Sequence, residues 1–338
     1  MPFDHYIPAS YLGRFSSDED RPRRRRRLWV ADRQQAKVYW QAATKICGAR
    51  DFYSVSSGPD PRLIDTMWTY ERDLNQALDS LIAGKLDVSQ WLNTLVRFVA
   101  ALLVRGPDFD IRFNGRFDWF GGALDDRLTK SNTHYARLFE WQRLLASIIG
   151  ARWLLIETSG QFTQVTNDLG YTPFVNPRLK EYGIAIPVGK QHILLIIACK
   201  KRVIATVNNG SWVPVIERGV LDDPEHAKFL DSIALCAQRY VLGPNELQMR
   251  KYLNPQATPP LIPEPDMLGF MSGPMARHYE MLYFHCVTQF AIPPSNPDAY
   301  VYVDFEKNMD CLAKCDAGPV IAMNRRSVAQ EDGVLLGL

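Results

Sequence analysis

The sequence predicts an α+β protein in which a mainly helical N-terminal half is followed by an antiparallel sheet with flanking helices. Apolar residues recur at helical spacing between about residues 60 and 150. Short β-branched and aliphatic segments, separated by turn residues, fill residues 151–220. A hydrophobic content of 46% and a charged content of 22% are ordinary for a globular chain, so we expect a packed core.

The first 61 residues are expected to be irregular, apart from one hairpin. Residues 5–15 mix aromatic and polar side chains, and five consecutive arginines follow at residues 23–27. The segments 28–32 and 37–40 predict two short strands that pair as a hairpin. Residues 51–61 contain Ser, Gly and Pro in quick succession, which predicts a loop.

Three helices are expected in the next part of the chain. The first spans about residues 62–83, and Gly84 ends it. The second begins after an N-cap at Asp87 and stops at Gly106-Pro107. It is apolar nearly all round, so we expect it at the centre of the core. The third covers about residues 131–149.

A sheet and a closing helix complete the predicted core, residues 1–245. The expected strands form an antiparallel meander: 153–157, 162–166, 184–188, 192–199 and 203–207. A helix follows at residues 224–240. Prolines cluster between residues 254 and 265 and predict a linker. After it, a C-terminal α/β extension within residues 246–338 is expected to pack on the core, with a helix near 274–286 and strands at 300–305 and 320–323.

The sequence also favours a cytoplasmic location. No segment reaches the roughly 18 uninterrupted apolar residues that a membrane span needs. The first residues lack the basic and then apolar layout of a secretory signal. The six cysteines are scattered, which is typical of reduced thiols. We therefore expect a soluble cytoplasmic protein without a membrane partner.

Positive charge is concentrated in the first 50 residues, which hold 11 Lys and Arg against 5 Asp and Glu. The centre of this charge is the run Arg23, Arg24, Arg25, Arg26 and Arg27. Clustered guanidinium groups bind phosphates, so the run is a candidate contact for nucleic acid or another polyanion. The alternative is a solvated loop whose charge is offset by the acidic residues 18–20.

Standard catalytic and nucleotide-binding motifs are missing from the sequence, so candidate site residues must be dispersed. His5 has a side chain suited to a general base or a metal ligand, or to a structural hydrogen-bond network. Glu71 and Arg105 would form either a buried ion pair or part of a site. Asp168 follows a predicted strand, where functional acids and turn-forming carboxylates are both common.

The opening segment resembles an uncharacterised bacterial family, one of the domains of unknown function. Members of that family begin His-Tyr-x-Pro-x-x-Tyr-Leu-x-x-Phe, and residues 5–15 read His-Tyr-Ile-Pro-Ala-Ser-Tyr-Leu-Gly-Arg-Phe. Asp51-Phe52-Tyr53, Glu71 and Arg105-Gly106-Pro107 are similar to later family elements. The resemblance extends over about residues 4–245, although the family's Ser-Asp-x-Pro turn lacks its proline at residues 166–169. It implies a shared site for His5, Tyr6, Glu71 and Arg105, but no activity.

These residues suggest a hydrolase that cleaves phosphodiester bonds in RNA or DNA, with a divalent metal as a cofactor candidate. His5 would be the general base or a ligand, and Glu71 and Asp168 the acids or metal ligands. Arg105 would stabilise developing negative charge, and Tyr6 and the arginine run would bind substrate. Two alternatives stay open: a non-catalytic nucleic-acid or protein binding or regulatory module, and an enzyme that modifies a peptide or small molecule.

Overall fold

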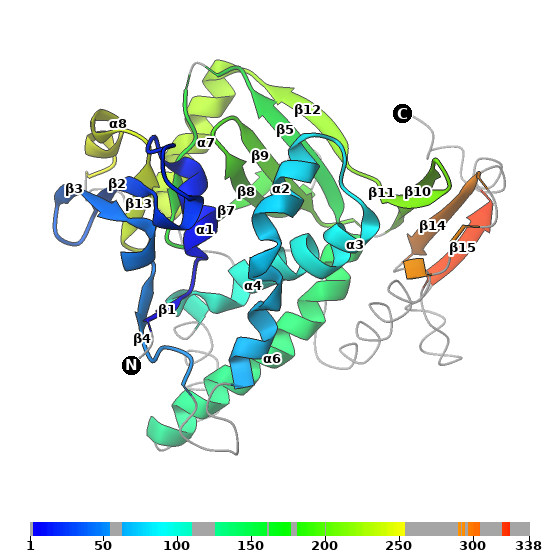
Figure 1. Cartoon of the computed structure of the whole chain (residues 1–338), viewed down its shortest axis with the longest axis horizontal. Helices are drawn as coiled ribbons and strands as arrows, with labels where there is room; N and C mark the ends of the chain where they lie inside the picture. The colour runs from blue at the N-terminus through cyan, green and yellow to red at the C-terminus, as the bar shows by residue number, and fades with distance from the viewer. Residues whose placement is uncertain are drawn as a thin grey trace.

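The structure is a computed structural model. It describes residues 3–54, 63–109, 126–160, 162–176, 181–199, 201–253, 290–291, 293–294, 297–304 and 320–324. Helices pack beside several antiparallel sheets, so the expected α+β class is confirmed (Figure 1). Within the described ranges, no helix is both long and apolar enough to cross a membrane.

The N-terminal segment contains short strands as well as short helices. Its elements are β1 (Phe3–His5), α1 (Ala9–Leu12), η1 (Gly13–Phe15), η2 (Arg23–Arg25), β2 (Arg27–Asp32), β3 (Lys37–Ala42), η3 (Ala43–Lys45) and β4 (Gly48–Arg50). Strands β2 and β3 form the expected hairpin, with Trp29 opposite Trp40. Strand β1 pairs with β4. Because these strands accompany the helices, the N-terminal half is not clearly mainly helical, which corrects the finer part of the prediction.

The expected helices are present, but two of them change type along their length. The elements are η4 (Leu63–Arg72), α2 (Leu74–Ile82), α3 (Val88–Gln90), the π-helical η5 (Trp91–Val96), α4 (Arg97–Arg105) and α6 (Asp126–Gly150). The carboxylate of Asp87 accepts a hydrogen bond from the Gln90 amide at 2.7 Å, as expected of an N-cap. Every residue of α4 after Arg97 is buried, so its central position is confirmed.

The main sheet has the strand order β12-β5-β9-β8-β7. Its strands are β5 (Arg152–Thr158), β7 (Thr172–Asn176), β8 (Glu181–Gly189), β9 (His192–Ile197) and β12 (Glu217–Leu221). Neighbouring strands are antiparallel except β12, which is parallel to β5. Along β9, Leu194 and Ile196 belong to the large core shared with the helices, whereas Ile193 and Leu195 face Phe229. Phe229 comes from α7 (Asp223–Cys236), so this helix covers the opposite face.

The single predicted meander is divided among three sheets. Of the expected strand 162–166, only Thr166 belongs to a strand. That strand is β6 (Thr166–Asn167), which joins the sheet β3-β2-β13-β6 through β13 (Tyr240–Gly243). The strand expected at 203–207 is β10 (Lys201–Asn208), in the sheet β11-β10-β14-β15. Strand β10 pairs with β11 (Ser211–Pro214) and β14 (Ala299–Asp304), and β14 pairs with β15 (Val320–Asn324).

The closing helix and the C-terminal segment also differ in detail from the expectation. The helix expected to reach residue 240 ends at Cys236, and residues 240–243 form β13 instead. A short helix, α8 (Glu246–Lys251), follows. Strands β14 and β15 agree with the two strands expected in the C-terminal extension, and β14 pairs with β10. The Pro-rich linker at 254–265 and the helix expected at 274–286 lie outside the described residues.

Candidate functional site

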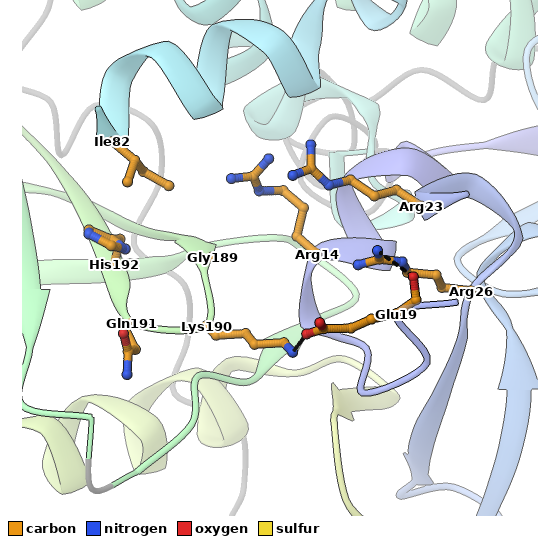
Figure 2. A pocket seen from close by; sticks show the side chains of 9 residues that line it. All are labelled: Arg14, Glu19, Arg23, Arg26, Ile82, Gly189, Lys190, Gln191 and His192. Atoms are coloured by element: carbon orange, nitrogen blue, oxygen red, sulfur yellow. Dashed lines mark hydrogen bonds and ion pairs between the residues drawn. The ribbon is translucent and has the colours of Figure 1, made fainter. Parts of the chain in front are cut away.

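A pocket of about 340 Å³ lies between the N-terminal segment and the turn that joins β8 to β9 (Figure 2). Its walls also include the end of α2. Positively charged side chains dominate the lining. The lining residues are Arg14, Glu19, Arg23, Arg26, Ile82, Gly189, Lys190, Gln191 and His192.

Arg14, in η1, is the most firmly fixed cation of this pocket. Its side chain is only 5% exposed. The Nε atom donates to the carbonyl of Val188 at 2.7 Å, and Nη1 donates to Asp79 at 2.9 Å and to Asn75 at 3.3 Å. Burial lowers the pKa of Arg14, while the charge of Asp79 opposes that shift. The Nη2 atom has no hydrogen-bond partner within the described residues, and it lies on the side of Gly189.

Asp79 joins Arg14 to the arginine run. Its Oδ2 atom accepts a hydrogen bond from Nη1 of Arg23 at 2.7 Å, and its Oδ1 atom accepts one from Nη2 at 3.2 Å. Burial alone would raise the pKa of the Asp79 carboxyl, but the bonds from Arg23 and Arg14 hold it below its usual range. Asp79 therefore stays ionised and fixes two guanidinium groups beside each other.

The approach of Arg23 to this position depends on Gly13. A Cβ atom at residue 13 would lie 1.9 Å from the carbonyl oxygen of Arg23, so only glycine fits against this backbone. The contact brings η2 onto the end of α1 and η1. The local backbone thus directs the start of the arginine run into the pocket.

The remaining cations, Lys190 and Arg26, both contact Glu19. The ammonium group of Lys190 forms an ion pair with the Glu19 carboxylate, which lowers the pKa of that carboxyl. Arg26 donates from Nη2 to the carbonyl of Glu19 at 3.2 Å and from Nε to the carbonyl of Arg21 at 2.9 Å. These contacts connect the loop after η1 to the β8–β9 turn across the pocket, as Figure 2 shows.

The pocket has more positive than negative charge. Four cationic side chains line it, and only Glu19 in the lining and Asp79 behind it oppose them. Burial lowers the pKa of His192, so its imidazole is neutral at pH 7 and offers a hydrogen-bonding nitrogen. A concave site with surplus positive charge raises the local concentration of anions. The arrangement can therefore hold an anionic group.

Three of the residues singled out in the sequence meet at a second place, around Arg105. This guanidinium is 3% exposed and donates to the carbonyl of His5, to the Glu71 carboxylate and, at 3.1 Å, to the hydroxyl of Tyr70. Its central carbon lies 4.1 Å from the ring centroid of Trp68. Glu71 and Arg105 thus form an ion pair, in which the Arg105 side chain is 3% exposed and the Glu71 side chain 33% exposed.

The side chains of His5 and Tyr6 border this network. The Nε2 atom of His5 is buried and has no hydrogen-bond partner in the described structure. Burial lowers the pKa of His5 and outweighs a hydrogen bond with the Thr44 backbone and the charge of Glu71, which both raise it. Tyr6 is 8% exposed, and burial raises the pKa of its hydroxyl.

Asp168 makes a different set of contacts. Its carboxylate accepts hydrogen bonds from the backbone N–H groups of Gln238 at 2.9 Å, Arg239 at 2.7 Å and Tyr240 at 3.1 Å. Burial raises its pKa to about 6, even though these bonds favour the ionised form. It forms no hydrogen bond or ion pair with His5, Glu71 or Arg105. Asp168 therefore holds the segment between α7 and β13.

The arginine run is divided between the pocket and the solvent. Arg23 and Arg26 line the pocket, whereas Arg24, Arg25 and Arg27 are exposed. Sequence reasoning missed Arg14 and Lys190 as site residues. Arg14 stands within the opening segment, and Lys190 occupies the turn between two strongly apolar strands. A basic residue in such a turn is a weak signal, because solvated turns are commonly charged.

No three His, Cys, Asp or Glu side chains among the described residues are grouped so that they could hold a metal ion. No curated protein and no solved structure matches the chain. The expected resemblance to an uncharacterised family is confirmed for residues 4–136, while residues 137–245 lie outside the match. Over residues 4–136, the chain matches the family described as "Protein of unknown function (DUF4238)".

Proposed function

We propose that the protein is a binding module for an anionic ligand, which it holds in the pocket lined by Arg14, Arg23, Arg26 and Lys190. The observation that carries the proposal is the buried guanidinium of Arg14. Two of its nitrogens are fixed by Val188, Asn75 and Asp79, and the third has no partner among the described residues. The Asp79 carboxylate offsets part of the cost of burying this charge, and an anion bound at the unused nitrogen would offset more of it.

The cations come from several elements of the fold. This supports a binding site that the fold assembles, and not a chance cluster of charge on one segment. Arg14 and Arg23 come from η1 and η2, Arg26 precedes β2, and Lys190 follows β8. The arginine run thus contributes two side chains to the pocket. The exposed members Arg24, Arg25 and Arg27 add positive charge nearby, which would speed the arrival of an anionic partner.

The test is calorimetric titration of the purified protein with pyrophosphate, a compact anion, at low and moderate salt. We expect binding that Arg26→Ala and Lys190→Ala each weaken by about tenfold, the value of one charge-assisted contact of ~1.4 kcal/mol. Arg25→Ala is the matched control, since Arg25 belongs to the same run but does not line the pocket. Absence of binding, or equal losses in all three variants, would contradict the proposal.

Hydrolysis of a phosphodiester in RNA or DNA is the second candidate function. One observation favours it: the Nε2 atom of His5 is buried and has no partner within the described residues, and the charge of Glu71 acts on the ring. A neutral imidazole with an unused nitrogen is suited to accept a proton. Against this, the Glu71 carboxylate is engaged by Arg105, and the Asp168 carboxylate by three backbone groups.

The hydrolase candidate is tested by incubating the protein with RNA and DNA, with and without Mg²⁺ or Mn²⁺. Cleavage by the wild-type protein that a folded His5→Ala variant lacks would support catalysis at His5. If His5→Ala cleaves as fast as the wild type, or if neither protein cleaves, this candidate is wrong. Retained circular dichroism and melting temperature are needed to show that the variant is folded.

A further inference from the structure

We infer that the pocket takes a small molecule ending in a phosphomonoester-type dianion, with Glu19 as the carboxylate that the ligand displaces from Lys190. This inference rests on the proposed anion-binding function and adds the chemical class of the ligand. Three properties of the pocket carry it: the number of unused donors, the balance of charge, and the space beside the cations.

Unused hydrogen-bond donors are found on the wall of the pocket that the N-terminal segment forms. In the described structure, Nη2 of Arg14, Nε of Arg23 and Nη1 of Arg26 make no hydrogen bond, although the other nitrogens of these side chains do. Figure 2 shows these arginines on one side of the pocket and Lys190 reaching in from the other. A carboxylate offers two oxygens, whereas a terminal phosphate offers three, so the phosphate makes fuller use of the donors.

The charge balance favours a dianion. Arg14, Arg23, Arg26 and Lys190 are opposed by two carboxylates, those of Glu19 and Asp79, which leaves two positive charges. A phosphomonoester has a charge of about −1.5 to −2 at pH 7. A phosphate inside a nucleic-acid strand has one negative charge. A terminal phosphate group therefore neutralises the pocket, while a single internal phosphate leaves it positive.

The size and the rest of the lining favour a small molecule. A volume of about 340 Å³ is near the lower end of the range for small-ligand sites, roughly 300–1,000 Å³. A Cβ atom at Gly189 would lie 3.6 Å from Ile82 and 3.8 Å from Nη2 of Arg14, so this glycine keeps the space beside both side chains open. The organic part of the ligand would lie against Ile82 and the neutral ring of His192.

Glu19 gives the inference a distinctive consequence. Its carboxylate forms an ion pair with Lys190, and its side chain is 64% exposed. An incoming phosphate must replace this carboxylate as the partner of Lys190. Glu19 therefore competes with the ligand, and its removal should strengthen binding instead of weakening it. Replacing a residue that only supports the structure of a pocket is expected to weaken ligand binding.

The test is calorimetric titration of the full chain with three probes. They are a nucleoside 5′-monophosphate, its parent nucleoside, and a ten-nucleotide DNA strand without terminal phosphates. We expect the monophosphate to bind at least about tenfold more tightly than either other probe, one decade being ~1.4 kcal/mol. Glu19→Gln should tighten monophosphate binding by about three- to tenfold. Glu246→Gln, which removes an exposed carboxylate paired with Arg250, is the matched control and should leave binding unchanged.

The outcomes separate this inference from the proposed function. If pyrophosphate binds through Arg26 and Lys190 but the DNA strand binds more tightly than the monophosphate, the ligand class is wrong and the anion site stands. The inference is also overturned if Glu19→Gln weakens binding of the monophosphate. If neither pyrophosphate nor the monophosphate binds, the proposed function itself fails.

Discussion

The Nη1 atom of Arg14 lies 2.9 Å from Oδ1 of Asp79, and this pair joins a buried arginine to an exposed aspartate. The same carboxylate binds Arg23, so a single residue of α2 fixes two cations that come from separate turns of the N-terminal segment. The pair also determines which Arg14 nitrogen remains available to a ligand. It is therefore the part of the pocket where stability and binding are most closely linked.

Removal of the Asp79 charge is expected to destabilise the protein. Asp79→Asn leaves the Arg14 guanidinium buried without its counter-charge. Breaking a fully buried ion pair costs about 3–5 kcal/mol, and because the Asp79 side chain is half exposed, we expect about 1–2 kcal/mol. Urea unfolding gives the free energy. Asp73→Asn is the control, since among the described residues the Asp73 carboxylate pairs only with exposed Arg72, at 3.7 Å. Equal losses in the two variants would contradict the role of Asp79.

A methyl group at residue 13 is expected to disturb both the fold and the pocket. In Gly13→Ala, the new Cβ atom would meet the Arg23 carbonyl at 1.9 Å, so η2 must move away from η1. We expect a loss of about 1–3 kcal/mol in the free energy of unfolding, as for other overpacked positions, and weaker binding of pyrophosphate. Gly210→Ala is a useful comparison, because nothing lies within 4 Å of its Cβ position, although its positive φ adds strain. Unchanged pyrophosphate affinity in a folded Gly13→Ala variant would contradict the role of this contact.

Local patterns in the sequence predicted individual elements better than their pairing. The hairpin β2–β3 was predicted because its strands are adjacent, and the apolar pattern of α4 correctly indicated a central helix. The expected strand 162–166 overlaps β6 only at Thr166. Its partner β13 was not predicted, because its first residue, Tyr240, was taken as the end of a helix. The parallel pairing of β12 with β5 joins segments about 60 residues apart, and no local signal specifies such a partner.

The candidate pocket was only partly predictable for the same reason. The arginine run was recognisable by its density of charge, and two of its five residues line the pocket. Arg14 and Lys190 are distant in the sequence and meet only when η1 packs against the end of β8, where Nε of Arg14 bonds the carbonyl of Val188. The grouping of His5, Glu71 and Arg105 followed from the family resemblance, and the structure brings them together.

Loss of the Glu71 charge is expected to destabilise the core next to Arg105. Glu71→Gln leaves a guanidinium that is 3% exposed with only neutral partners. Because the Glu71 side chain is 33% exposed, we expect about 2–3 kcal/mol, somewhat below the cost of breaking a fully buried pair. Chemical denaturation measures the loss, and Glu246→Gln, from an exposed helical pair, should cost less than about 0.5 kcal/mol. A stable Glu71→Gln variant that has lost nuclease activity would instead favour catalysis.

The buried side chain of Asn167, in β6, makes four hydrogen bonds, and their loss can be tested. Its amide nitrogen donates to the carbonyls of Tyr171 at 3.1 Å and Ile233 at 2.8 Å, and its oxygen accepts from the amides of Leu169 and Gly170. In Asn167→Asp, a carboxylate oxygen takes the place of the amide nitrogen. The two hydrogen bonds that this nitrogen donates then become repulsive contacts between buried oxygens. We expect a loss of at least about 3 kcal/mol by urea unfolding. Asn93→Asp, on an exposed helix surface, should change stability little.

The buried carboxyl of Asp168 predicts a specific dependence of stability on pH. Burial raises its pKa from the ordinary 3.8 to about 6, so the folded state binds this proton more tightly than the unfolded state. The resulting stability is fully present below pH 4 and is lost as the pH rises through 6. Three histidines whose pKa is lowered by burial, His5, His192 and His226, act in the opposite direction.

A comparison with Asp168→Asn isolates this carboxyl, because the histidines titrate in both proteins. The variant loses an acceptor for the N–H groups of residues 238–240 and is expected to be less stable at every pH. The stability advantage of the wild type should then grow as the pH falls from 6 to 4, by up to about 1.4 kcal/mol per pH unit. Urea unfolding at about pH 4.5, 5.5 and 7 measures the difference. A constant difference would mean that Asp168 keeps an ordinary pKa, with the three backbone N–H groups stabilising its charge enough to cancel the effect of burial.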